Sequence, residues 1–583
     1  MKLIGIPGNR VPSVRVAIPV WLIGVYLGAG CSAVPPDEPV EQVAAADSAA
    51  LVLDINRSLA VTDLPTLEAT DAHGEPRFSF HRVLAQVAGS SGTCPSFGAA
   101  QLYQRIFDTN NTKAGGYVAD GQHCDDQKDA HGTPTLNGFP IQCPRQEGAL
   151  ANLSAHNPFC SGAGCDPYTP IAITNRFDLA PSNGQTCGQY RIVFGKGSGQ
   201  TPLALAGNPN AFNRTLVIFE AVLPNPRPTL GLAGCAPVVE LWAGLSGVSD
   251  PAKRAEALDR FFFTGISGFE PVVKFSHYTG AVDPQTTVQL SGQIRANQFM
   301  FDLPPPLGGQ PWQLREYNLD HACSGAGVHR TCSARVKMVT PKVNPDATLF
   351  DDNNTSPAAL AFRDPGNPGG FLGQVSQLAK NDLNLLNMNG LSPAFNTSQS
   401  TSSPGLGSPP FNEANYNPAF NPKGAFTTKI QAVLTGMHSK LDPLHIVRRA
   451  QTQACAGCHE LATSTASFFG GVKESNLLGG GLTWPDAALD SVPAAPGGGF
   501  PAFTQTSEQV LMPLASGVTC DAACTAHPTT CQCAWRLSAA LTDVFLPFRR
   551  DNMRWFLKET YNGTWNNNQP NNASERMCGS PDN

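Results

Sequence analysis

The chain has 583 residues, of which 41% are hydrophobic and 14% are charged, and its formal net charge is -6. Its apolar fraction excludes a largely disordered protein, and its length predicts more than one domain. A slightly acidic chain without a basic stripe is not expected to bind nucleic acid. With 56 Gly and 50 Pro, the fold should be rich in loops.

The N-terminus has the features of an export signal. Lys2, Arg10 and Arg15 precede a short apolar run that ends in small residues before Cys31. This pattern predicts a signal peptide over residues 1–30, because the run is too short for a membrane-spanning helix. A Pro-rich, acidic segment over residues 31–46 is expected to be a tether between Cys31 and the folded body.

Leu27-Gly28-Ala29-Gly30-Cys31 resembles a bacterial lipoprotein signal, although Gly28 stands where Leu is usual. The resemblance implies that Cys31 becomes the lipidated N-terminus after cleavage. The protein is then anchored to a membrane by its N-terminal lipid. Its expected location is extracytoplasmic, at the outer membrane or the cell surface.

The cysteine content agrees with export. The chain has 17 cysteines, an odd number, and Cys31 is the one expected to stand apart. Without Cys31, Cys455 and Cys458, an even set remains, which predicts up to seven disulfides in an oxidising compartment. This set comprises Cys94, Cys124, Cys143, Cys160, Cys165, Cys187, Cys235, Cys323, Cys332, Cys520, Cys524, Cys531, Cys533 and Cys578.

Residues 47–345 are expected to form a disulfide-rich α+β domain based on a sheet. Apolar periodicity predicts helices over Phe78–Val87, Ala99–Phe107 and Pro251–Phe263. Short apolar runs bounded by Gly, Pro and Asn predict strands at 171–173, 190–194, 216–219, 288–290 and 336–339. Three arginines in or beside these strands, Arg176, Arg191 and Arg295, either form salt bridges at strand edges or recognise an acidic ligand.

The C-terminal part is expected to hold a second, smaller unit. Residues 346–429 contain a loop-rich linker, residues 430–560 a small all-α unit, and residues 561–583 a disordered tail. Asp442 and Pro443 are a suitable N-cap and first residue for a helix that runs to Ala454. A further helix is predicted over Arg536–Leu546, ended by Pro547.

The predicted helix from Pro443 leads into Cys455-Ala456-Gly457-Cys458-His459. C-x-x-C-H is the attachment signature of c-type haem. The two thiols add to the vinyl groups of one covalent haem, and His459 then binds the iron. The alternatives are a disulfide between the cysteines and half of a zinc site, but no second ligand pair stands at matching spacing.

The sixth position on the iron is predicted to be filled by Met512. Met512 precedes Pro513, 53 residues after His459, and thioether ligation suits electron transfer. His527 and Met553 are rival ligands, and Met512 as an ordinary core residue is the alternative. An open sixth position would instead permit oxygen or peroxide chemistry.

Several segments resemble large exported proteins of myxobacteria. The resemblance rests on 175–181 (Asn-Arg-Phe-Asp-Leu-Ala-Pro), 187–194, 292–299, the C-A-G-C-H segment and 479–485 (Gly-Gly-Gly-Leu-Thr-Trp-Pro). It spans most of the mature chain. It implies the architecture and contributes no mechanism.

Together these patterns predict a lipid-anchored, single-haem, cytochrome-c-like protein that transfers electrons to an unidentified redox partner. Two alternatives stay open. One is a cell-surface binding or structural lipoprotein without haem, and the other is a haem oxidase or peroxidase with an open iron. The sequence leaves open whether the protein is an enzyme.

Overall fold

A computed structural model describes residues 52–92, 98–118, 121–144, 156–159, 167–196, 215–266, 268–285, 288–299, 312–325, 331–402, 413–458, 478–485 and 506–561. The chain divides into two compact units, Met1–Ala49 and Ala50–Asn583. The predicted signal peptide, Cys31 and the tether lie outside the described residues, and so does His459. Every described residue belongs to the second unit.

The centre of this unit is an eight-stranded antiparallel sheet. Its order is β1-β4-β5-β6-β7-β8-β10, and β9 also pairs with β8. The strands are β1 (Ala60–Val61), β4 (Tyr168–Arg176), β5 (Thr186–Lys196), β6 (Thr215–Pro224), β7 (Gln293–Phe299), β8 (Trp312–Ser324), β9 (Thr331–Val339) and β10 (Ser400–Ser402). The predicted strands at 171–173, 190–194, 216–219 and 336–339 are therefore confirmed.

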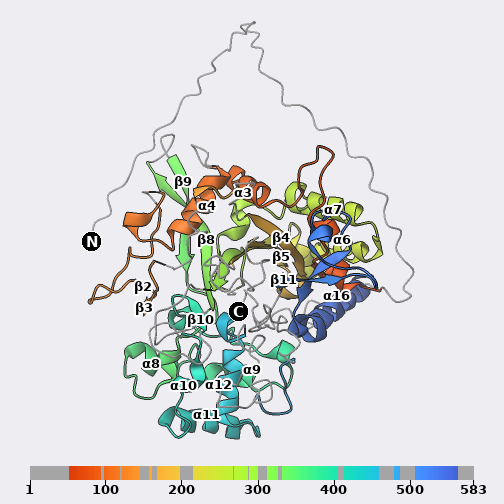
Figure 1. The fold of residues 1–583 in the computed structure, drawn as a ribbon. Coiled ribbons are helices and arrows are strands. Elements are labelled where there is room, and N and C mark those ends of the chain that lie inside the picture. Colours follow the sequence, from red (N-terminus) through yellow and green to blue (C-terminus); the bar gives the residue numbers. More distant parts are fainter. Residues whose placement is uncertain are drawn as a thin grey trace, which may run out of the picture. The chain divides into compact units, whose positions relative to one another are not determined.

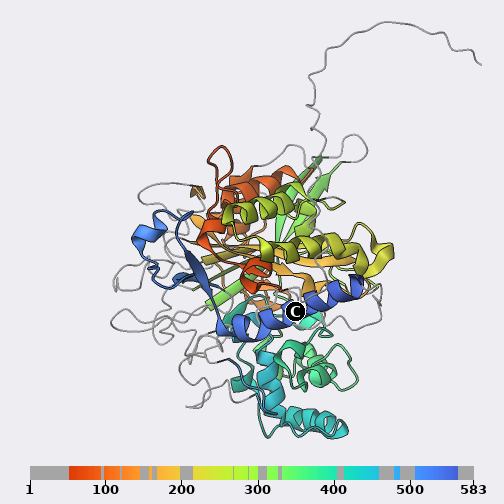
Figure 2. The same cartoon turned by 90° about the vertical axis from the view of Figure 1, so that its right-hand side faces the viewer.

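One face of the sheet is apolar and aromatic. Phe80 of α3 (Phe80–Gly89) packs against Phe194 and Phe219 of the sheet, and Tyr190 contacts Trp242 of α6 (Ala236–Gly244). Helices α3 and α4 (Ala99–Asp108) lie on one side of the sheet in Figures 1 and 2. The apolar stripes of the sequence thus become the contact between helices and sheet.

The opposite side of the sheet carries the helices of the C-terminal half. These include α8 (Pro357–Phe362), α9 (Val375–Leu378), α10 (Tyr416–Ala419), α11 (Ala425–Gly436) and α12 (Pro443–Gln451). In Figure 1 they form the green and teal group below the sheet. A cluster of aromatic rings around Phe350 and Phe362 holds this group together.

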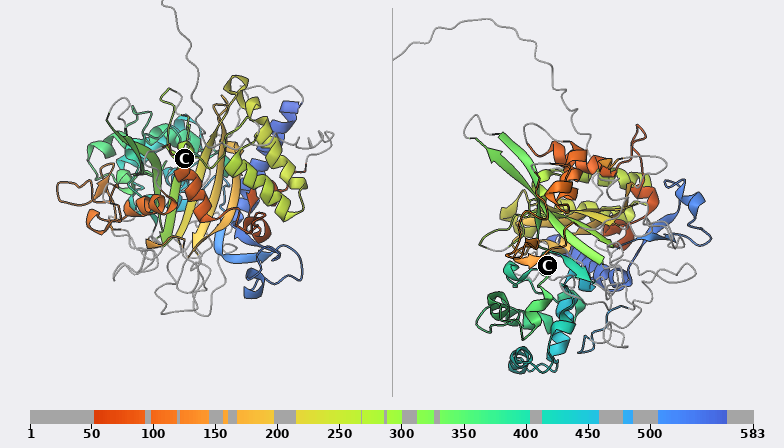
Figure 3. Two further views of the ribbon diagram at one scale, coloured as in Figure 1. Left: turned by 90° about the horizontal axis from the view of Figure 1, so that it is seen from above. Right: turned by 60° about the vertical axis from the view of Figure 1, so that its left-hand side comes forward.

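The segment 430–560 is not confirmed as a separate all-α unit. It contains an antiparallel hairpin of β11 (Thr506–Pro513) and β12 (Cys533–Leu537), and β10, which precedes it, joins the central sheet. The hairpin extends the fold beyond β1, because Trp535 N donates a hydrogen bond to the Thr62 carbonyl. Figure 3 shows this blue hairpin beside the orange strands of the sheet.

Two local predictions were wrong. The strand lies at Gln293–Phe299 and not at 288–290, where the structure has only an isolated bridge at Gln289. The helix predicted over Arg536–Leu546 is present only in part: its first residues belong to β12, the π-helical turn η15 spans Ala540–Phe545, and the chain continues directly into α16 (Leu546–Tyr561), so Pro547 does not end it. Pro547 lies where this π-helical turn passes into α16, a place where the regular α-helical hydrogen-bond pattern is already interrupted.

Five disulfides join cysteines of the described part, in agreement with the predicted disulfide-rich body. They are Cys124–Cys143, Cys187–Cys235, Cys323–Cys332, Cys520–Cys533 and Cys524–Cys531. Among described helices, the stretch Pro228–Gly247 is long and apolar enough to cross a membrane. Half of it is buried inside the fold, as is common for a core helix.

Candidate functional site

The C-A-G-C-H segment directly follows α12. Asp442 caps this helix and Pro443 is its first residue, so the predicted helix start is confirmed. The helix ends at Gln451, three residues before the predicted end, and Cys455–Cys458 form a new helical turn. The motif thus occupies a short turn of its own, in which Cys458 N donates a hydrogen bond to the Ala454 carbonyl at 2.9 Å.

Close packing fixes this turn against its surroundings. A Cβ on Gly457 would lie 2.2 Å from the Gln451 carbonyl oxygen, so only glycine fits at this place. Ala456 N donates a hydrogen bond to Ser400 Oγ of β10 at 2.9 Å. These contacts place the motif against the end of the central sheet.

The motif meets the polar face of the sheet through Cys455. Arg295 Nη1 of β7 donates a hydrogen bond to Cys455 Sγ at 3.9 Å. The same guanidinium donates through Nη2 and Nε to Glu316 Oε2 of β8, at 2.6 and 3.0 Å. Glu220 Oε2 of β6 lies 3.5 Å from Arg295 Nε, and all four side chains are buried.

Cross-strand register creates this polar face. Glu220 pairs with Arg191 on one neighbouring strand and with Gln293 on the other, and Arg295 pairs with Glu316. Residues opposite each other on paired strands share a face, as do residues two apart on one strand. The two arginines and two glutamates therefore form one neutral buried network, which Gln293 extends by donating to Glu220 at 2.6 Å.

Burial determines the protonation of this network. Burial raises the pKa of the Cys455 thiol, although the Arg295 guanidinium acts in the opposite direction. Burial alone would lower the pKa of Arg295, but the carboxylates of Glu316 and Glu220 hold that pKa above its usual value. Cys455 is therefore a neutral thiol next to a permanent cation, and not an activated thiolate.

The described cysteines do not fit a covalently bound haem in this arrangement. Two thioether bonds require both sulfurs of the motif. Cys458 is already disulfide-bonded and has no exposed surface, and Cys455 is a free thiol that is 4% exposed. A disulfide between Cys455 and Cys458, the other interpretation of the motif, is also not formed. The assignment of His459 to the iron stays a prediction.

The structure does not bring Met512 together with Cys455. Met512 lies on β11 and is 48% exposed. Its partner strand β12 joins the sheet next to β1, whereas Cys455 contacts β7. Four strand spacings of about 4.8 Å separate β1 from β7, or roughly 19 Å, whereas both axial ligands of a haem bind the same iron.

The two rival ligands are also distant from the motif in their contacts. Met553 of α16 is buried, and its sulfur accepts a hydrogen bond from Asn175 Nδ2 of β4 at 3.4 Å. His527 is exposed in the loop between β11 and β12. None of the three contacts Cys455 or Cys458 among the described interactions.

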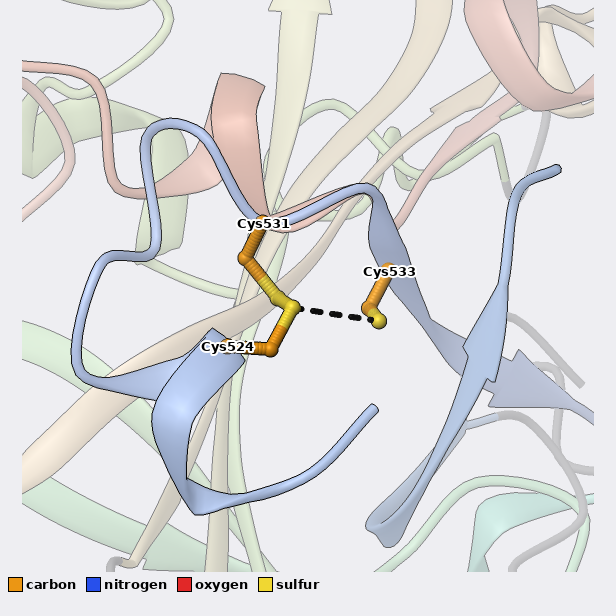
Figure 4. A group of neighbouring side chains, drawn as sticks. All are labelled: Cys524, Cys531 and Cys533. Atoms are coloured by element: carbon orange, nitrogen blue, oxygen red, sulfur yellow. Dashed lines mark hydrogen bonds between the residues drawn. A yellow bond between two sulfur atoms is a disulfide. The ribbon is translucent and has the colours of Figure 1, made fainter. Parts of the chain in front are cut away.

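Three cysteine sulfurs lie within 4.8 Å of one another, two from the loop between β11 and β12 and one from Cys533 at the start of β12. Cys524 Sγ is 3.5 Å from Cys533 Sγ, as drawn in Figure 4. Cys524 is bonded to Cys531, and Cys533 is bonded to Cys520. Since metal ions bind thiolates, this group is a pair of stacked disulfides and does not provide metal ligands.

Loop 478–485 packs onto the helix that precedes the motif. Arg449 of α12 donates hydrogen bonds to the carbonyls of Leu478 and Gly479, at 2.7 and 2.8 Å, and to that of Leu378 at 3.0 Å. Gly480 has φ of 62°, and a Cβ there would lie 2.7 Å from Asn381 Oδ1. A Cβ on Gly479 would lie 2.5 Å from His445 Cγ of α12, so Gly479 and Gly480 permit the close approach of this loop.

A cavity of about 630 Å³, which no sequence pattern indicated, lies at the β1 edge of the fold. It is bounded by the β11–β12 hairpin, by α1 (Ile55–Ser58) and by the start of α7 (Pro251–Asp259). Trp535 and Arg254 line it, and Met512 and Leu514 stand at its exposed edge. The sequence holds no signal for it, because its walls come from three distant segments.

Arg254 is held in place by a buried ion pair. Its Nη2 donates to Asp63 Oδ2 at 2.8 Å, and its Nη1 donates to the Val248 carbonyl at 2.8 Å. Trp535 is fixed through its backbone, which bridges the hairpin to β1. Cavities of this volume with a few fixed polar groups are typical of small-molecule sites.

Comparisons of the chain with protein-family models, with curated proteins and with solved structures found no match.

Proposed function

We propose that this protein is a lipid-anchored, extracytoplasmic binding protein that takes up a small molecule in the cavity beside the β11–β12 hairpin. The observation that carries the proposal is this 630 Å³ cavity, which lies within the size range of small-molecule sites. The lipoprotein-like signal and Cys31 support the anchoring, and the disulfides support an oxidising compartment.

In this proposal the C-A-G-C-H segment is a structural element. Cys455 contributes to a closed, neutral network with Arg295, Glu220 and Glu316, and Cys458 forms a disulfide. Buried thiols of raised pKa are inert. The turn then serves to fix α12 and the C-terminal helices to the polar face of the sheet.

The experiment is ligand-observed NMR with a library of small fragments and the purified mature chain. Thr542 lines the cavity and has an exposed side chain, so Thr542→Trp should fill the cavity without disturbing the core. The matched control is Asp543→Trp, the neighbouring exposed residue, which does not line the cavity. Fragments should bind the parent chain and Asp543→Trp but not Thr542→Trp. A set of fragments that binds all three chains equally would overturn the proposal.

A second candidate is the single-haem, c-type electron-transfer protein, which the C-A-G-C-H sequence favours. In a haem-loaded form the Cys458 sulfur forms a thioether bond to the haem. The disulfide of Cys458 must then be absent, because the sulfur cannot form both bonds. The oxidase or peroxidase alternative has the same requirement.

Intact-mass measurement after denaturation separates these candidates from the first. The chain should be produced in a host that matures c-type cytochromes. We expect no haem adduct. One retained haem that is lost in Cys455→Ala plus Cys458→Ala would establish the second candidate.

A further inference from the structure

Two disulfides lie in contact at the end of the β11–β12 hairpin. The Cys524–Cys531 pair lies within the segment that Cys520–Cys533 closes. Cys524 Sγ and Cys533 Sγ, which belong to different disulfides, are 3.5 Å apart (Figure 4). A disulfide bond measures about 2.0 Å, so a shift of roughly 1.5 Å would bring these two atoms to bonding distance.

One residue of each pair is accessible to a reagent in solution. Cys520 and Cys524 are half-buried, whereas Cys531 is 3% exposed and Cys533 is fully buried. Residues 526–527 next to them are exposed. Disulfides exchange when a thiolate attacks one of their sulfurs, and the attacking thiolate must be able to reach that sulfur. Exchange with an external thiol therefore begins at Cys520 or at Cys524.

A dithiol that attacks Cys524 forms a mixed disulfide with it, and Cys531 leaves as a thiolate that takes a proton from water. The second thiol of the dithiol then closes the reagent's own disulfide and releases Cys524 as a thiolate. This thiolate attacks Cys533 Sγ across the 3.5 Å contact. The Cys524–Cys533 bond forms, the Cys520–Cys533 bond breaks, and Cys520 leaves and is protonated.

Attack on Cys520 leads to the same product. Cys533 leaves as a thiolate and attacks Cys524 Sγ across the same contact, which displaces Cys531. The second thiol of the dithiol then frees Cys520. By either route the dithiol loses two electrons and becomes a disulfide. The protein keeps one bond in this segment, Cys524–Cys533, with Cys520 and Cys531 as thiols.

We infer that Cys520, Cys524, Cys531 and Cys533 form a dithiol–disulfide exchange site, in which reduction by a dithiol moves the remaining disulfide to Cys524–Cys533. The new bond would close a loop intermediate in length between the 7 residues of Cys524–Cys531 and the 13 residues of Cys520–Cys533. Closure probabilities over this range differ by less than about threefold, so loop length does not oppose the relocation. The inference does not depend on ligand binding in the cavity.

The test is limited reduction of the purified mature chain with dithiothreitol. N-ethylmaleimide blocks the new thiols, and iodoacetamide labels the remaining cysteines after complete reduction. Peptide fragmentation then assigns each label to its cysteine. Among segments with two maleimides, we expect at least about one tenth to carry them on Cys520 and Cys531, since the three possible bonds are similar in closure probability. A smaller share would overturn the inference.

Cys323–Cys332 is the internal reference for the strength of the reductant. Cys323 is exposed, and no third cysteine sulfur of the described residues lies within 4.8 Å of both sulfurs of this pair. Its two cysteines should therefore be blocked together, without relocation. If Cys520, Cys524, Cys531 and Cys533 all stay bonded at dithiothreitol concentrations that reduce Cys323–Cys332, the inference is overturned as well.

Cys520→Ser tests the sulfur contact without a reductant, at a half-buried position where serine is a small change. The Cys533 thiol that remains should attack Cys524, so maleimide should block Cys531 in some chains and Cys533 in the others, in shares that differ less than about threefold. The matched control is Cys323→Ser, in which maleimide should block Cys332 alone. Circular dichroism confirms that both variants are folded. Blocking confined to Cys533 in Cys520→Ser would show that the two sulfurs do not exchange, and would overturn the inference.

Discussion

Arg295 Nη1 lies 3.9 Å from Cys455 Sγ, so a charge of the central sheet and the C-A-G-C-H turn meet inside the protein across 160 residues of sequence. Arg295 also forms ion pairs with Glu316 and Glu220. This single side chain therefore connects three strands to the segment that the sequence makes most conspicuous. Removing it should affect the fold and the accessibility of the thiol together.

Arg295→Met should lower the free energy of unfolding by about 3–5 kcal/mol, because it leaves the buried Glu316 without its cation, while Glu220 keeps Arg191. Urea unfolding measures this loss. The control is Arg335→Met, since Arg335 and Asp320 form an ion pair whose side chains are 43% and 45% exposed. That change should lower stability by less than about 1 kcal/mol. Similar losses in both variants would contradict a buried network.

Thiol labelling tests the same relationship. Cys455 is 4% exposed and its pKa is raised by burial, so iodoacetamide should modify it slowly in the native parent chain. Arg295→Met should accelerate the modification severalfold by loosening the network around the sulfur. Peptide mass spectrometry locates the modified residue. Rapid modification of Cys455 in the native parent chain would show that the turn is open in solution.

Glu413 should make the protein less stable as the pH rises. Burial raises its pKa from the usual 4.5 to about 8, so the folded protein keeps a proton that the unfolded chain releases. Stability should therefore fall between about pH 4.5 and pH 8. Glu413→Gln should remove this contribution and gain roughly 1–3 kcal/mol over the parent at pH 8, with little difference at pH 4.

Urea unfolding at several pH values tests the role of Glu413. Glu68 should contribute a similar slope in both chains, because burial raises its pKa to about 7. The difference in unfolding free energy between the parent and Glu413→Gln at each pH therefore does not contain the contribution of Glu68. A difference between the parent and Glu413→Gln that stays constant from pH 4 to pH 8 would show that Glu413 is ionised in the fold.

Two disulfides should differ in their contribution to stability. Cys187–Cys235 closes a separation of 48 residues, whereas Cys323–Cys332 closes one of 9 residues at the end of the β8–β9 pair. Loop entropy alone predicts that replacing the first pair by alanines lowers stability by about 1.5 kcal/mol more than replacing the second. Burial of Cys187 and Cys235 adds to the difference. Equal losses in thermal or urea unfolding would contradict this ranking.

Lipid attachment at Cys31 is tested by metabolic labelling with palmitate. The parent chain should be labelled, and Cys31→Ala should not be, because no other cysteine follows the signal-like segment directly. A Cys31→Ala chain that is labelled as strongly as the parent would exclude the anchor. Membrane fractionation of both chains gives an independent measure of the anchoring.

The sequence by itself determined those helices and strands in which buried apolar residues recur at a regular spacing. The apolar runs that became β4, β5, β6 and β9, and the stripes that became α3, α4 and α7, could be predicted because burial imposes a fixed period. The start of α12 at Asp442 and Pro443 also follows from neighbouring residues alone. The cysteine content predicted a disulfide-rich body, but not the pairing.

Strands with polar faces could not be predicted in this way. β8 places Glu316 in the buried network and Arg315 on Asn110, so its sequence lacks an apolar face to recognise. The arginines Arg191 and Arg295 were expected at strand edges, yet both lie on central strands and are buried. Only the pairing of β5, β6, β7 and β8 brings each opposite charge within reach.

The candidate sites also depend on contacts between segments that are distant in the sequence. The sequence identified C-A-G-C-H as a motif, but the tertiary structure decided that Cys455 faces Arg295 and that Cys458 is bonded elsewhere than to Cys455. Met512 was placed beside the motif by spacing along the chain, whereas the hairpin carries it to the β1 edge, where it borders a cavity. Burial period and helix caps are local, while strand register and cavity walls depend on contacts between distant segments, which no local pattern encodes.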